Sequence, residues 1–102
     1  MMQNTVRNAQ LVCKRMVKIE EYALELVYSL HIRVCDDPQL CADHEYDVLI
    51  EKEQRGEREC AVLWSVSSIY DEALRMFDTA HRCRVTPMCA LEFAEEYFAS
   101  HM

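Results

Sequence analysis

The chain is poor in the two residues that most often turn or break a backbone. Its 102 residues include one glycine and two prolines, where average usage would give about seven and five. Tight turns commonly use glycine, because glycine adopts positive φ without steric cost. The scarcity therefore argues against a β-sandwich or a small barrel, and it leaves nearly the whole chain able to continue a helix.

Motifs of catalysis and of membrane insertion are lacking as well. There is no GxSxG sequence, no glycine-rich phosphate loop and no GxGxxG fingerprint, and one glycine cannot build them. No run of apolar residues approaches the length of a membrane span. Residues 1–18 are interrupted by charges and do not resemble a signal peptide. These features predict a non-enzymatic cytoplasmic protein whose six cysteines stay reduced.

Positive charge is scarce and unevenly placed. Eighteen acidic residues oppose eleven basic ones, so the net charge is −7. This balance disfavours a nucleic-acid binder, which needs a positive footprint. Residues 1–19 nevertheless carry four bases and no acid, namely Arg7, Lys14, Arg15 and Lys18. A nucleic-acid-associated regulator that uses this basic N-terminal segment remains a secondary hypothesis.

What the chain does have is apolar residues, which make up 51% of it. One set is spaced alternately four and three residues apart: Val12, Met16, Ile19, Ala23, Leu26 and Leu30. A second set repeats that spacing: Val62, Val66, Ile69, Ala73, Met76 and Ala80. Such spacing is typical of one face of an α-helix. It predicts helices over about 5–34, 38–55 and 58–84, with a fourth beginning at Thr86–Pro87.

These segments predict an all-α fold in which two αα-hairpins pack as an irregular four-helix bundle. Residues 1–102 then form a single helical domain, with Leu26 and Phe77 in its core. The alignment of the two apolar sets also suggests an internal duplication of 10–50 and 60–100. An α+β alternative stays open, with a β-hairpin at about 46–66 that turns between Gln54 and Glu57.

One group of histidines and cysteines has a spacing that a metal ion could use. His31 and Cys35 lie four residues apart near the end of the first predicted helix, and Cys41 and His44 lie three apart in the second. A tight turn between these helices would bring two imidazoles and two thiolates together, which suits tetrahedral zinc. A zinc- or redox-responsive regulator is therefore the alternative function.

The main functional prediction is a protein-interaction module, meaning an adaptor, inhibitor or regulator that binds a protein partner through an apolar helical face. The two long predicted helices carry more apolar surface than their short neighbours can cover, and such surplus normally marks an interface. We expect a homodimer in which the N-terminal end of the first helix lies at the interface. The residues predicted to bind the partner are Val6, Ala9, Val12 and Cys13, with Arg7, Lys14 and Lys18 at the rim.

Overall fold

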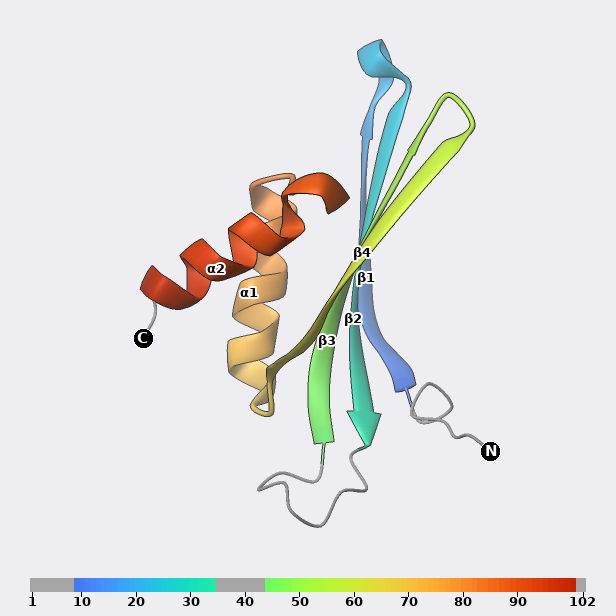
Figure 1. The fold of residues 1–102 in the computed structure, drawn as a ribbon. Coiled ribbons are helices and arrows are strands. Elements are labelled where there is room, and N and C mark those ends of the chain that lie inside the picture. The colour runs from blue at the N-terminus through green and yellow to red at the C-terminus, as the bar shows by residue number, and fades with distance from the viewer. Residues whose placement is uncertain (1–8, 35–43, 101–102) are drawn as a thin grey trace, which may run out of the picture.

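The computed structural model describes residues 9–34 and 44–100, which form a four-stranded antiparallel sheet followed by two helices (Figure 1). The strands lie in the sheet in chain order. The elements in sequence are β1 (Ala9–Ile19), η2 (Glu20–Tyr22), β2 (Leu24–Val34), β3 (His44–Gln54), β4 (Glu57–Ser67), α1 (Tyr70–Arg82), η3 (Pro87–Cys89) and α2 (Ala90–Ser100).

The predicted all-α bundle is therefore wrong, because the first two predicted helices are strands and the third, predicted over 58–84, is strand β4 up to Ser67 and helical only from Tyr70 to Arg82. Residues 9–34 form the β1–β2 hairpin, and His44–Gln54 is β3. The β-hairpin considered as an alternative over 46–66 is present as β3–β4. Within β2 the apolar residues also alternate, and Leu26, Tyr28 and Leu30 are all buried. That period of two fits a half-buried strand at least as well as the helical spacing fits a helix.

The turns of both hairpins are made almost without glycine. Ala23 closes the β1–β2 turn in the left-handed conformation at φ 52°. The β3–β4 turn uses Arg55 at φ 54° and Gly56 at φ 83°, a pair of positive φ values typical of a two-residue hairpin turn. The scarcity of glycine did not prevent tight turns, because alanine and arginine occupy positions that glycine usually fills.

The C-terminal part of the chain is helical, as the sequence predicts. The α1 and α2 helices lie on the same side of the sheet (Figure 1). The sets of residues aligned for the duplication adopt different structures, since 24–34 is a strand and 70–82 is a helix. In the described ranges, 9–34 and 44–100, no helix combines the length and apolar character needed to cross a membrane.

The core lies between the helices and the sheet. Tyr28 and Ile50 from the sheet and Phe77 from α1 are fully buried. The predicted burial of Leu26 and Phe77 is confirmed, with 1% and 0% of each residue exposed. The hydroxyl of Tyr28 donates a hydrogen bond of 2.9 Å to the carbonyl of Val85, so this buried polar group is satisfied. One face of the sheet is thereby buried against the helices, and no described helix covers the other.

Candidate protein-binding face

The sheet surface turned away from α1 and α2 is called the open face below. The strand register places side chains on it in rows that cross all four strands. One row contains Lys14, Ser29, Leu49 and Val62, and the next contains Met16, Val27, Glu51 and Cys60. No described helix covers this face (Figure 1).

An apolar stripe runs obliquely across the open face. It consists of five side chains: Met16, Val27, Leu49, Val62 and Trp64. Met16 is 51% exposed and Trp64 is 60% exposed, while the other three are partly buried. Large apolar side chains scattered singly over a surface are normal, but a contiguous group of them on one uncovered face is typical of an interaction site.

Charged side chains of both signs border this apolar stripe at the end near the hairpin turns. Lys18 lies 3.8 Å from Glu25 across β1 and β2, and Arg58 lies 3.6 Å from Glu53 across β4 and β3. Both pairs are solvent-exposed and contribute little to stability. Each of these two pairs places an acidic group beside a basic one, so part of the positive charge on the open face is balanced.

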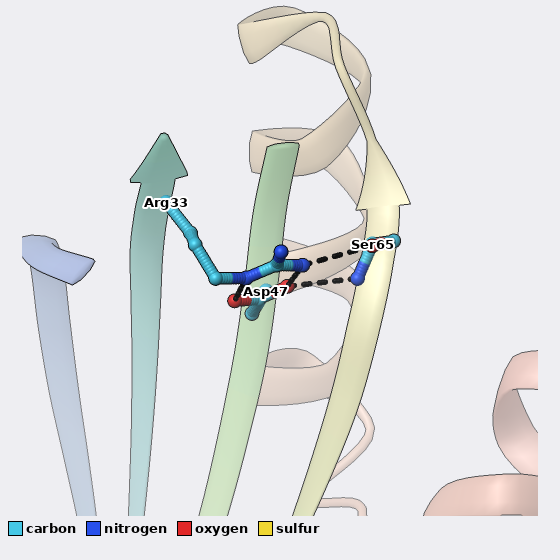
Figure 2. A network of polar contacts seen from close by, with 3 residues as sticks. All are labelled: Arg33, Asp47 and Ser65. Atoms are coloured by element: carbon cyan, nitrogen blue, oxygen red, sulfur yellow. Dashed lines mark hydrogen bonds and ion pairs between the residues drawn. The ribbon is translucent and has the colours of Figure 1, made fainter. Parts of the chain in front are cut away.

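A polar network centred on the buried carboxylate of Asp47 lies at the opposite end of the open face. The guanidinium of Arg33 donates to both carboxylate oxygens of Asp47, at 3.0 and 3.1 Å. Arg33 also donates to the hydroxyl of Ser65 at 2.9 Å, and the backbone N–H of Ser65 donates to Asp47 at 2.8 Å. Figure 2 shows that the three residues come from three adjacent strands, β2, β3 and β4. The network therefore links these three strands by hydrogen bonds at this end of the open face.

The network also fixes the position of the exposed indole of Trp64. The register between β3 and β4 shifts between Tyr46 and Val48, and Ser65 takes a left-handed φ of 53°. Such irregularities re-aim the neighbouring side chain. The Arg33 guanidinium lies 5.6 Å from the centre of the Trp64 ring, within the range of a cation–π contact. The indole is therefore held in one place although it is mostly exposed.

A hollow of about 210 Å³ lies beside this indole. Its wall includes Leu49, Val62 and Trp64 of the apolar stripe, together with Ala9 and His31. The Nε2 atom of His31 is buried and has no hydrogen-bond partner in the structure. The volume suits a single side chain of a partner better than a substrate or cofactor, because small-molecule sites usually span about 300–1,000 Å³.

The ionisable groups with shifted pKa values lie on the face that the helices cover. Burial raises the pKa of the Tyr28 hydroxyl to about 12. Burial also raises the pKa of the Cys13 thiol, while the nearby Arg15 acts against that shift. A raised pKa makes Cys13 less of a nucleophile at neutral pH. Neither group points to activated chemistry on the open face.

The structure describes only two of the four residues of the predicted metal site, His31 and His44. His31 lies on the open face, paired with Asp47, whereas the His44 ring packs against Tyr46, which belongs to the core. The two imidazoles thus lie on opposite faces of the sheet. Cys35 and Cys41 lie outside the described residues. Within the described ranges, no three His, Cys, Asp or Glu side chains are grouped as metal ligands, and zinc binding by the full set stays a prediction.

The residues predicted to bind a partner do not share a helical face, because they lie on a strand. Lys14 and Lys18 lie on the open face and Cys13 lies on the covered face, while Val12 lies at an irregularity in β1. Ala9 borders the hollow, and Val6 and Arg7 fall outside the described residues. The helical reason for this assignment is wrong, although β1 still contributes Met16 and two lysines to an exposed surface.

Sequence reasoning missed the residues that now define the candidate site, namely Arg33, Asp47 and Trp64. A signal was available: Asp47 is the single charge inside the apolar run from Tyr46 to Ile50. Buried charges in such runs are normally paired. Comparison with protein-family models, with curated proteins and with solved structures finds no match to this chain.

Proposed function

We propose that this chain is a non-enzymatic, cytoplasmic protein-interaction module that binds a partner protein through the open face of its sheet. The observation that supports the proposal is the apolar stripe of Met16, Val27, Leu49, Val62 and Trp64, which no described element covers. An uncovered stripe of this kind leaves apolar area in water, and burying it against a partner is favourable.

The arrangement of the stripe matches the anatomy of protein interfaces. Interfaces have an apolar centre and a polar rim, and a few tryptophan, tyrosine and arginine side chains supply most of the binding energy. Here Trp64 and Arg33 are stacked near one end, and the exposed pairs Lys18–Glu25 and Arg58–Glu53 lie at the other. Because the buried network holds Trp64 in place, less side-chain freedom is lost on binding.

The polar groups of the open face favour binding over catalysis. The carboxylate of Asp47 is occupied by three hydrogen bonds, and it is only 3% exposed. A general base must lie within reach of a substrate proton, and the Asp47 carboxylate is almost fully buried beside Arg33. We infer that the Arg33–Asp47 pair is a positioning element for Trp64 and for the wall of the hollow.

The hollow indicates how a partner would be recognised. It has space for one side chain, and its wall is apolar except near His31 and the Arg33–Asp47 pair. A partner of suitable chemistry presents a bulky apolar side chain from an otherwise polar surface, with charges of both signs around it. The near balance of charge on the open face disfavours a nucleic acid as that partner.

Site-specific crosslinking tests the proposal. A photoreactive amino acid replaces Leu49 on the open face and, as a control, Ile69 at the start of α1, and the tagged protein is irradiated in its native cells. Ile69 is 53% exposed and Leu49 is partly buried, so the control position is at least as accessible as the position under test. We expect a discrete protein adduct from position 49 and none from position 69.

The captured protein is then purified and titrated with two variants by calorimetry. We expect Met16→Glu to weaken binding at least tenfold, because an unpaired charge is placed in an apolar contact, and Ile69→Glu to bind like the wild type. Equal adducts from both positions, or unchanged affinity of Met16→Glu, would overturn the proposal.

A further inference from the structure

The two edge strands of the sheet differ in how well they are protected against pairing with another strand. Natural sheets protect edges with bulges, lysines and charged side chains that point inward. The β1 edge has all three features. Its register is irregular between Leu11 and Cys13, Lys14 and Lys18 are exposed, and Arg15 points to the helix side, where it pairs with Asp78.

The central part of the β4 edge, residues 60–63, has none of these features, although charged residues 57–59 precede it and an irregularity follows it. It contains no lysine and no proline, and its pairing with β3 is regular from Glu57 to Leu63. It carries five consecutive apolar residues, 60–64. In the described part of the chain no strand lies beyond β4. A regular apolar edge of this kind is a template for another strand.

The apolar run of β4 is compatible with a second copy of itself. The run is centred on Val62, so an antiparallel pairing about a two-fold axis at Val62 places Cys60 opposite Trp64 of the second copy and Ala61 opposite its Leu63. Residues 57–59, which carry the charges, then lie opposite residues 65–67, which carry none. Like charges are not opposed at any position, and this is the condition for favourable cross-strand pairs.

The helices beside β4 supply a second exposed apolar area at the same edge. Both η3 and α2 contact β4. Met88 in η3 is 82% exposed and Leu91 in α2 is 68% exposed. Pairing of two β4 strands would bring α2 of each copy near the two-fold axis, where Met88 and Leu91 can be covered. The exposed apolar surface at this edge thus includes Met88 and Leu91 as well as β4 itself.

We propose that β4 pairs with β4 of a second copy to form a two-fold dimer with a continuous eight-stranded sheet. A two-fold axis perpendicular to the sheet keeps both open faces on the same side, so the dimer would present them together to a partner. This inference is independent of the proposed partner, because self-association is measured on the purified chain. A dimer that packs open face against open face is the competing arrangement, and the experiment separates the two.

The first measurement is the mass of the purified chain by light scattering and sedimentation across about 1–100 micromolar, the range in which modest interfaces dissociate. We expect a shift from monomer to dimer with rising concentration. Val62→Lys places a lysine at the centre of the β4 edge and should shift the dissociation midpoint at least tenfold upward. The matched control is Met16→Lys, on the open face but at the opposite edge, and it should leave the midpoint unchanged.

Hydrogen exchange identifies the surface directly. Edge pairing forms new backbone hydrogen bonds, so amides of residues 60–64 should exchange more slowly at high concentration, while those of β1 should not change. Cys60→Lys serves as a second edge variant, because Cys60 is exposed and its replacement should not affect folding. A wild type that stays monomeric throughout would overturn the proposal. So would a loss of the dimer in Met16→Lys as large as that in Val62→Lys, because Met16 and Val62 share the open face and only face-to-face packing would cover both side chains.

Discussion

Replacing Asp47 with alanine should destabilise the protein more than any surface change, because it removes a buried carboxylate that accepts from both the Arg33 guanidinium and the Ser65 backbone N–H. The carboxylate accepts two hydrogen bonds from Arg33 and one from the backbone N–H of Ser65, all at 2.8–3.1 Å. The Asp47 side chain is 5% exposed and the Arg33 side chain 13%. Removing one partner of a buried ion pair costs about 3–5 kcal/mol.

The expected cost for Asp47→Ala lies at the lower end of that range, at about 3 kcal/mol. Arg33 keeps its hydrogen bond to the Ser65 hydroxyl and its contact with the Trp64 ring, and these interactions offset part of the loss. Asp47→Asn keeps the shape and one acceptor oxygen, so it should cost about half as much. The matched control is Glu53→Ala, which breaks the exposed pair with Arg58 and should cost less than about 0.5 kcal/mol.

The assay is urea unfolding followed by fluorescence and by far-UV circular dichroism. The chain has one tryptophan, and it contacts Arg33, so the fluorescence of Trp64 reports on the network itself. Coincident transitions from the two signals would establish two-state unfolding and make the free energies comparable. If Asp47→Ala cost less than about 1 kcal/mol, the network would not be a structural support of the open face.

Three further results are expected. Phe77→Ala should cost about 3–5 kcal/mol in urea unfolding and Lys14→Ala less than about 0.5, because only Phe77 leaves a cavity in the core. Burial raises the pKa of the Tyr28 hydroxyl from 10 to about 12, so on raising the pH the unfolded chain loses the hydroxyl proton before the folded chain does. The free energy of unfolding should therefore fall by about 2 kcal/mol between pH 10 and 12. Tyr28→Phe should lose less stability over this pH range than the wild type. Ala23→Gly should raise the urea midpoint, since alanine in the left-handed region costs about 1–2 kcal/mol and only part of that is offset by the greater flexibility of glycine.

The sequence predicts the C-terminal third of the fold well, for local reasons. The α1 helix has acids in its first turn and a base in its last, at Asp71, Glu72 and Arg82, as the helix dipole favours. Pro87 begins the turn that leads into α2. These signals act within a few residues of one another, so they can be read without knowledge of the rest of the fold.

The strands could not be separated from helices by the same reasoning. Between Leu24 and Ile32 apolar residues are so frequent that both a period of two and a period of 3.6 find matches. The choice between them is made by long-range pairing: β2 lies between β1 and β3 and is hydrogen-bonded along both sides. Such pairing is invisible to local propensity, which tertiary contacts routinely override.

The scarcity of glycine misled the prediction for a related reason. Among the described residues, four other than glycine take positive φ, and they lie at turns, at the irregularity in β4 and after α1: Ala23, Arg55, Ser65 and Arg84. Each costs about 1–2 kcal/mol locally. Each of the four strands is eleven residues long. Their backbone hydrogen bonds and buried side chains supply enough free energy to stabilise these conformations. Amino-acid composition affects the free-energy cost of a turn, but a scarcity of glycine does not prevent a turn from forming.

The candidate site depends on the most non-local features of all. Arg33 and Asp47 meet only when β2 and β3 adopt their observed register, and Ser65 joins them only because β4 is irregular at that point. At this irregularity the Ser65 N–H has no regular strand partner, and it donates its hydrogen bond to the carboxylate of Asp47 instead. Trp64 lies on the open face by ordinary strand alternation, because Val62 is on that face and Leu63 is in the core, and its ring lies beside Arg33. Stability and binding are therefore coupled at this end of the sheet, because the group that satisfies the irregular backbone also holds the residue we expect to contact the partner.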